Sequence, residues 1–390
     1  MHSPLPAAAP PARLGQVVCF IAAATCAFAG VWMSLPLASV LLAEAGASPA
    51  LVGLYAASVW AASLASAPLT PWLAGRAGGA LHLHRLAAAG GAVVLLALAL
   101  GPPLWVWFLL GPALGVATCL TWTTADALAG ALARPGSEGR FLGLYQTFVS
   151  AAIGGGPATL WLWGVRPEAF VGSAALMLVG LAFTAPLQEP PGAVPRRSRL
   201  TLPRVKPVAL MMLAPAGAAA LCGVLESLSG SVFPVMALGL GMSAGAAASI
   251  VVATGFGNTL SQYPVGWLAD RFGTAPVLLG CAMVVAAGVL VWPALAPDPW
   301  IWPVLAVWGG AAGAIYTLGM VRAVQRFAGP ARAIGMAGLN TAYLLGGAIG
   351  APVAGVVLER GGDAALTGAV ALLALAGGAG LAALSRRARA

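Results

Sequence analysis

Charged residues are scarce in this 390-residue sequence: Asp, Glu, Lys and Arg together make up 7% of it, whereas hydrophobic residues make up 60%. A soluble globular chain has roughly 25% charged residues. A chain so poor in charge cannot cover itself with a water-compatible surface, so it has to present apolar side chains to lipid. The composition therefore predicts an integral membrane protein surrounded by a lipid bilayer.

Clusters of residues that would do chemistry are also missing. The three histidines and five cysteines stand at none of the usual metal-binding spacings, and the cysteines all fall inside apolar segments. No P-loop sequence occurs. We therefore expect no metal, no cofactor, no ATP-driven step and no enzymatic activity. The formal net charge of +9 comes from basic residues in short gaps between apolar segments, so we expect no nucleic-acid partner.

Long apolar segments fill the rest of the sequence. About 20 apolar residues span a bilayer as a helix, and only helices and closed barrels satisfy their backbone hydrogen bonds in lipid. The segments are too long for barrel strands and do not alternate. The sequence thus predicts an all-α membrane protein with twelve transmembrane helices, at residues 15–42, 50–74, 83–100, 104–132, 141–164, 168–187, 207–238, 244–268, 275–295, 300–325, 333–357 and 364–384.

The distribution of proline and basic residues divides and orients the chain. A Pro- and Arg-rich linker at 188–206 separates a predicted N-terminal six-helix bundle (1–187) from a C-terminal one (207–390). Of the 19 Lys and Arg residues, all but Arg166 and Arg360 fall on the side of this linker. The positive-inside rule then predicts cytoplasmic termini in a multi-pass protein of the bacterial inner (plasma) membrane, and we expect a monomer.

An internal repeat relates the two halves. Residues 72–80 read WLAGRAGGA and residues 267–275 read WLADRFGTA, at an offset of 195 (267 minus 72). The same offset relates Gly155 and Pro157 to Gly350 and Pro352. A shared offset that includes Trp, Arg and Pro indicates duplication. Two parallel six-helix repeats are typical of major facilitator transporters.

The second copy of the repeated loop carries a recognisable motif. Gly266, Asp270, Arg271 and Gly273 resemble the signature G-x-x-x-D-R-x-G-R-R of the major facilitator superfamily. The resemblance implies a cytoplasmic latch between helices, and the alternative is a positively charged turn without a gating role. Thr274 and Ala275 replace the trailing arginines.

In the first copy of the loop only Arg76 and Gly78 remain of the signature. Gly75 stands where the signature has its Asp. We therefore expect the first half to build its latch differently.

The fifth predicted helix resembles the antiporter motif of drug-exporting facilitators at Gly143, Gly156 and Pro157. The alternative is a generic kink in a membrane helix. The fourth helix has Gly111 where those exporters usually carry an Arg. The second half also resembles the YcaD-like branch of the superfamily, at Gly309-Gly310 with Tyr316 and at residues 343–355.

Two acidic residues lie well inside predicted spans, where a charge is costly and usually functional. Glu226 is near the middle of the seventh span, one of four that the resemblance places around a central cavity. It is our candidate to bind a cation or take a proton; the alternative is a carboxyl hydrogen-bonded to Ser227, Ser229 or a neighbouring helix.

Asp126 lies in the fourth span. We expect it to form a gating ion pair with Arg76 or Arg140. Its repeat position in the tenth span is next to Arg322, which we assign to the same gating set.

Trp32, Trp122 and Asn340 sit deep in their spans and complete the predicted pathway. Together these features predict a secondary active transporter of a small solute that works by alternating access, with a preference for proton-coupled efflux of an apolar or cationic molecule. The alternatives are an importer of a small nutrient such as a sugar or organic acid and, from another class, a non-transporting membrane receptor. Anionic substrates fit less well because no Lys or Arg lies at membrane depth.

Overall fold

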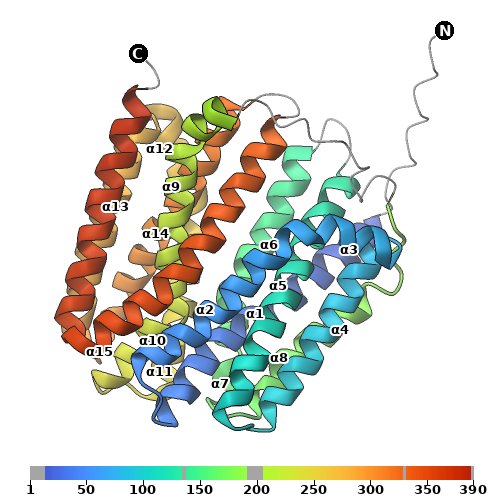
Figure 1. Cartoon of the computed structure of the whole chain (residues 1–390), viewed down its shortest axis with the longest axis horizontal. Helices are drawn as coiled ribbons and strands as arrows, with labels where there is room; N and C mark the ends of the chain where they lie inside the picture. Colours follow the sequence, from blue (N-terminus) through green and yellow to red (C-terminus); the bar gives the residue numbers. More distant parts are fainter. Residues whose placement is uncertain (1–13, 134–137, 191–204, 328–330, 388–390) are drawn as a thin grey trace.

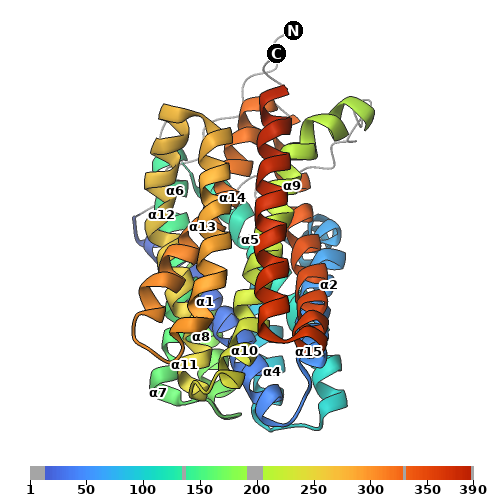
Figure 2. The ribbon, with the colours of Figure 1, turned by 90° about the vertical axis from the view of Figure 1, so that its left-hand side faces the viewer.

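The computed structural model describes residues 14–133, 138–190, 205–327 and 331–387. Helices fill these ranges, and the described residues contain no strand. The helices run side by side from one end of the molecule to the other in both views (Figures 1 and 2). The predicted all-α membrane fold is confirmed, and eight segments of the described chain are long and apolar enough to cross a membrane.

The first-half helices are α1 (Leu14–Glu44), α2 (Pro49–Ser66), the 3-10 turn η1 (Ala67–Leu69), α3 (Thr70–Ala77), α4 (Ala80–Ala99), α5 (Leu104–Leu132), α6 (Glu138–Ala158), α7 (Leu160–Trp163) and α8 (Ala169–Phe183). The second-half helices are α9 (Val205–Gly230), α10 (Val232–Gly239), α11 (Ala244–Ala248), α12 (Ile250–Phe272), α13 (Thr274–Val291), the 3-10 turn η2 (Trp292–Leu295), α14 (Ile301–Arg326) and α15 (Ala331–Arg387). Every predicted span coincides with one to three of these elements. Residues 191–204 of the predicted linker lie outside the described residues, so the domain boundaries stay a prediction.

Two details of how helices connect go beyond the predicted spans. The seventh span breaks between α9 and α10 at Ser231, whose hydroxyl donates to the Ser227 carbonyl oxygen at 2.5 Å. Such a side-chain bond competes with the helical ladder. The last two spans join in α15, where Gly362 adopts a φ of 71° that favours glycine and turns the chain back.

The two ends of the bundle carry different loops. Arg76 and Arg271 lie at the end where Figure 1 shows α3 and the C-terminal part of α15, which we call the basic end. The short helices α7, α10 and α11 lie at the opposite end. That the basic end faces the cytoplasm stays a prediction of the positive-inside rule.

Equivalent close contacts appear in both halves. A Cβ atom at Gly156 of α6 would lie 2.1 Å from the carbonyl oxygen of Ala29 on α1. A Cβ atom at Gly350 of α15 would lie 2.8 Å from the Cα atom of Val224 on α9. Ala29 and Val224 are 195 residues apart (224 minus 29), the offset of the sequence repeat, whereas Gly156 and Gly350 are 194 apart (350 minus 156), so the two contacts correspond to within one residue. Small residues let membrane helices approach this closely, and the duplication is thus visible in the packing.

The halves meet along the seams α2–α15, α6–α12 and α1–α10. Hydrogen bonds between described residues also link the halves toward the opposite end. Ser39 donates its hydroxyl to the Gly230 carbonyl at 3.3 Å, and Trp161 donates Nε1–H to Ser249 Oγ at 2.7 Å. The backbone N–H of Ala50 donates to a Glu359 carboxyl oxygen at 3.0 Å. The halves are therefore tied together at the opposite end.

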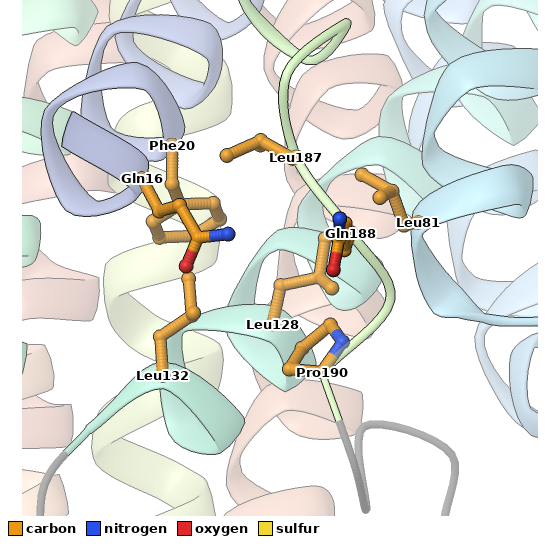
Figure 3. A pocket seen from close by; sticks show the side chains of 8 residues that line it. All are labelled: Gln16, Phe20, Leu81, Leu128, Leu132, Leu187, Gln188 and Pro190. Atoms are coloured by element: carbon orange, nitrogen blue, oxygen red, sulfur yellow. The ribbon is translucent and has the colours of Figure 1, made fainter. Parts of the chain in front are cut away.

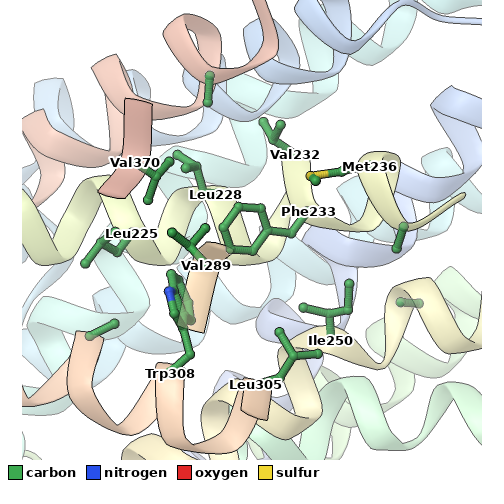
Figure 4. Packing of buried hydrophobic residues seen from close by; sticks show 14 of the residues in the cluster. Leu225, Leu228, Val232, Phe233, Met236, Ile250, Val289, Leu305, Trp308 and Val370 are labelled. Atoms are coloured by element: carbon green, nitrogen blue, oxygen red, sulfur yellow. The ribbon is translucent and has the colours of Figure 1, made fainter. Parts of the chain in front are cut away.

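A buried apolar cluster fixes the second half around the α9–α10 break. The Phe233 ring of α10 lies 5.4 Å from the Trp292 ring and 5.2 Å from the Trp308 ring, measured between centroids. Figure 4 shows Phe233 among Leu228, Val289 and Leu305. Since buried aromatic pairs add about 0.5–1.5 kcal/mol beyond their area, this cluster stabilises the short α10 beneath the end of α9.

Candidate functional site

Glu226 is held within the second half by side chains from two helices. Tyr343 of α15 donates its hydroxyl to Glu226 Oε2. Cys222, one turn earlier on α9, directs its thiol to Oε1 at 3.8 Å. Ser227 and Ser229 donate instead to backbone carbonyls, of Val224 and Glu226. Of the partners considered from the sequence, the neighbouring helix supplies the hydrogen bond.

Aromatic rings from both halves pack against Tyr343, the hydrogen-bond partner of this carboxyl. The Tyr343 ring lies 5.4 Å from the Tyr316 ring of α14 and 5.3 Å from the Trp60 ring of α2, both edge-on. Trp60 is 7% exposed, and its Nε1 has no hydrogen-bond partner. Gly347 makes room for it, because a Cβ atom there would lie 2.4 Å from the indole. The site thus reaches across the α2–α15 seam.

Asp126 forms a second carboxyl–tyrosine pair in the first half. Tyr145 of α6 donates its hydroxyl to Asp126 Oδ1 at 2.9 Å. Arg76 lies over the Trp72 ring at 4.4 Å, so the predicted ion pair between Asp126 and Arg76 is not formed in this conformation. The pair with Arg140 stays a prediction, because the Arg140 side chain lies outside the described residues.

The two carboxyls, of Glu226 and Asp126, have corresponding hydrogen-bond donors in the two halves. Each carboxyl receives its hydrogen bond from the fifth helix of its own half, from Tyr343 and Tyr145 respectively. Both carboxyls were predicted site residues, whereas the tyrosines were not predicted as their partners.

The predicted pathway residues lie around these pairs. Asn340 is half-buried on α15, three residues before Tyr343 and on the same helix face. Trp32 and Trp122 pack against the buried first-half cluster that includes Phe28 and Tyr145. The Trp32 Nε1 atom is buried without a hydrogen-bond partner.

The loop motif of the second half is completed from another helix. Gly273 has a φ of 84°, which glycine tolerates best, whereas Gly266 has open space around it and no close contact to explain it. Arg271 stacks on Trp267, and the Asp270 side chain is exposed. Thr274 accepts a 2.5 Å hydrogen bond from the Nε–H of Arg322 on α14. Arg322 thus reaches the position where the signature carries its first trailing arginine.

The first half ties its helices together through a reciprocal pair of caps. The Glu189 carboxylate accepts hydrogen bonds from the backbone N–H groups of Ala80 and Leu81, both at 2.8 Å, at the N-terminus of α4. Arg85 of α4 donates Nη2–H to the Thr184 carbonyl at 2.6 Å, at the C-terminus of α8. Each charge complements the dipole of the helix end that it meets. Gly78 ends α3 with a φ of 86° just before this site.

Neither Arg85 nor Glu189 was singled out from the sequence. The sequence did contain a signal for them, because the acidic Glu189 follows the sixth predicted span and the basic Arg85 lies near the start of the third. What was missing was the knowledge that these two helix ends are neighbours.

The fifth-helix motif is explained in part by packing. Gly156 is required by the contact with Ala29. Pro157 stands one residue before α6 ends at Ala158, and because it has no N–H to donate to the carbonyl four residues earlier, it weakens the last turn of this helix. The side-chain environment of Gly143 lies outside the described residues.

Two hollows occur away from the carboxyls. The pocket in Figure 3, at the basic end, has a volume of about 10 Å³, room for about one water molecule. A larger apolar cavity of about 440 Å³ lies between α9 and both arms of α15. We place the functional site at the carboxyls because ionisable groups at membrane depth are seldom without function.

Comparison with known proteins supports a transporter. Residues 215–390 match the family model of the Major Facilitator Superfamily. The chain is 28% identical over 305 residues to the "Uncharacterized MFS-type transporter YfkF" of Bacillus subtilis (strain 168), covering 74% of each protein.

Solved structures agree on the fold. The nucleoside transporter NupG superposes with a TM-score of 0.73 at 17% identity, over 96% of this chain and 99% of that one. A D-xylose–proton symporter gives 0.72 at 15% identity, over 92% and 96%. An inward-facing bacterial homologue of the lysosomal transporter Spinster gives 0.68 at 18% identity, over 96% of each.

The matched family model and the Bacillus relative indicate a membrane transporter rather than an enzyme. The fold of the solved transporters extends over 96% of the chain, and together these comparisons support a transporter of the major facilitator type.

Proposed function

We propose that this chain is a secondary active transporter that moves a small solute by alternating access and couples its export to protons through Glu226. The observation that supports this most is a carboxyl at membrane depth whose tyrosine partner touches both halves. Rocking of one half against the other would alter that contact, and a mechanism of this kind needs a site at the interface of the repeats.

The hydrogen bonds between the halves are found toward one end of the bundle, which fits one state of an alternating-access cycle. The hydrogen bonds between the halves lie toward the opposite end. With the basic end in the cytoplasm, this arrangement corresponds to a state closed toward the outside. We place the protein in a bacterial inner membrane, as a monomer, with both termini in the cytoplasm.

The substrate that this site fits best is apolar or cationic. Aromatic rings next to a carboxyl attract cations, and no Lys, Arg or His is among the described side chains that contact Glu226. Trp32, Trp122 and Asn340 would line the path to it. The partial fifth-helix motif supports export and kinship with drug antiporters.

Import of a small nutrient is the second candidate. A nucleoside transporter and a D-xylose–proton symporter share this fold, so the fold alone does not select export. A non-transporting receptor is the candidate from another class.

The test is transport in proteoliposomes that enclose a pH-sensitive dye, under an imposed pH gradient. A panel of organic cations, sugars, nucleosides and organic acids is added one compound at a time. We expect at least one compound to dissipate the gradient in the wild type and not in Glu226→Gln. Glu168→Gln makes the same chemical change at an exposed residue and should behave as wild type. Equal coupling in Glu226→Gln would remove the proton role, and absence of counterflow for every compound would favour the receptor.

A further inference from the structure

Trp60 and Tyr343 form the contact between aromatic rings that joins the two halves within the described chain. The other ring pairs each lie inside one half. Tyr343 is also the residue that donates to Glu226. One side chain therefore touches both the candidate proton site and the opposing half.

The backbone around Tyr343 is fixed against its own half. A Cβ atom at Gly223 of α9 would lie 2.0 Å from the Tyr343 carbonyl oxygen, and one at Gly346 would lie 2.1 Å from the Ala220 carbonyl oxygen. Helices in such backbone contact move together. A change at Glu226 would then reach α2 through the Tyr343 side chain rather than through a shift of α15 against α9.

Trp60 and the helix that carries it are also closely packed against α15. Gly347 presses against the indole ring, and a Cβ atom at Gly53 of α2 would lie 2.4 Å from the Ala351 carbonyl oxygen. The indole has no hydrogen bond to hold it. Its position along the seam therefore depends on packing against Tyr343 and Gly347.

We propose that Tyr343 is the positioning residue that couples the charge state of Glu226 to the α2–α15 seam. Trp60 is the residue of the first half that the Tyr343 ring contacts and acts on. When Glu226 is ionised, its carboxylate accepts a hydrogen bond from the Tyr343 hydroxyl. When Oε2 takes up a proton or a cation, this hydrogen bond is released and the position of the Tyr343 ring against Trp60 changes. Other titratable groups near Glu226 are Cys222 on α9 and Tyr316 on α14, with Asp126 of α5 beyond Tyr316. The proposal rests on the proposed function of Glu226.

The experiment follows conformation rather than transport, so it needs no substrate. Spin labels are placed on exposed residues at the basic end, Leu86→Cys on α4 and Leu213→Cys on α9, with the half-buried Cys19 and Cys26 replaced by serine. Distances between the labels are measured in lipid nanodiscs from pH 5 to pH 9. We expect the wild type to change its distance distribution with a single midpoint.

Tyr343→Phe keeps the ring against Trp60 and removes the hydroxyl. Because the hydroxyl stabilises the ionised carboxyl, its loss should move the midpoint to higher pH by about one unit or more. Trp60→Ala should leave the midpoint in place and reduce the amplitude of the distance change at least about twofold, and Trp60→Tyr should restore part of it. Tyr263→Phe and Trp105→Ala, at exposed positions, are the matched controls and should match the wild type.

The outcomes distinguish the proton role of Glu226 from the coupling through Tyr343. If Glu226→Gln retains the pH response of the wild type, the proton role of Glu226 fails. If Glu226→Gln abolishes the response while Tyr343→Phe and Trp60→Ala behave as the controls do, Glu226 keeps its role and the coupling through Tyr343 is overturned.

Discussion

At the scale of single residues, glycine decides how closely the helices approach, and its neighbours decide which glycines matter. Gly155 and Gly156 are adjacent on α6, and the sequence alone does not show which of the two lies in a helix contact. A Cβ atom at Gly156 would collide with α1, whereas one at Gly155 would meet nothing within 4 Å. The repeat offset in the sequence pointed to Gly155, but the contact belongs to Gly156.

We predict that Gly156→Ala destabilises the protein by about 1–3 kcal/mol, the usual cost of forcing extra volume into a packed site. Gly155→Ala is the matched control and should be neutral, or stabilising by up to about 1 kcal/mol, because alanine favours a helix. Thermal unfolding of both variants in detergent gives the comparison. A melting temperature for Gly156→Ala equal to that of Gly155→Ala would contradict the α1–α6 contact.

The carboxyl–tyrosine pair of the first half gives a second prediction at this scale. Tyr145→Phe removes the hydrogen bond to Asp126 and leaves the ring stacked on Phe20, 5.5 Å between centroids. If Asp126 serves gating rather than substrate contact, the variant should change the transport rate about two- to tenfold and leave the substrate preference unchanged. Rates measured across the compound panel test this, and a changed order of preferred substrates would assign Asp126 to the substrate site.

At the scale of elements, the positions of the helices were predictable from the sequence and their junctions were not. Apolar runs long enough to span a bilayer have few alternatives to helix, which is why the predicted spans coincide with α1 to α15. At the α9–α10 break the Ser231 hydroxyl bonds back to the Ser227 carbonyl, a contact that the apolar pattern does not report. The caps at Arg85 and Glu189 depend on α4 and α8 being neighbours, which no local pattern reports.

The same limit applies to the candidate site. Glu226 and Asp126 could be found because charge inside an apolar span is rare. Tyr343 and Trp60 could not be joined to Glu226 from the sequence, since they come from helices far apart along the chain. Arg322 was assigned to the gating set because it follows the repeat position of Asp126 in the sequence, but its hydrogen bond to Thr274 was not predicted.

The cap that Glu189 forms at the N-terminus of α4 leads to a prediction about amide hydrogen exchange in that helix. Glu189→Gln keeps one amide oxygen as acceptor but removes the charge at the N-terminus of α4, which is worth about 0.3–1 kcal/mol. We expect amide hydrogens in the first turn of α4, at Ala80 and Leu81, to exchange about two- to fivefold faster. Hydrogen exchange followed by mass spectrometry measures this, with Glu168→Gln as control. Unchanged exchange at Ala80 and Leu81 would show that the cap contributes nothing in the membrane.

At the scale of the whole molecule, hydrogen bonds at the opposite end hold one conformation of the two halves. Each such bond contributes about 0.5–1.5 kcal/mol net, so a few of them are enough to bias a two-state equilibrium whose states differ by a few kcal/mol. Their loss should therefore shift populations without unfolding the protein.

We predict that Ser249→Ala together with Glu359→Gln raises the population open at the opposite end about five- to thirtyfold, since both changes weaken bonds between the halves. Spin labels at the exposed Leu100 and Trp300 report this opening. Thr341→Ala, which removes a hydrogen bond inside α15 only, is the control. A double variant with the same distances as Thr341→Ala would mean that apolar packing alone keeps this end closed.

The single-residue turn at Gly362 also bears on how the protein is made. Glu359, Arg360 and Asp363 lie at or beside that turn, and with cytoplasmic termini, as the positive-inside rule predicts, they would have to cross the bilayer as the last two spans are inserted. With no loop between the arms of α15, we expect the two arms to leave the insertion machinery together as one hairpin. The helix that bears Tyr343 would then reach its place only after the second arm of α15 has been translated.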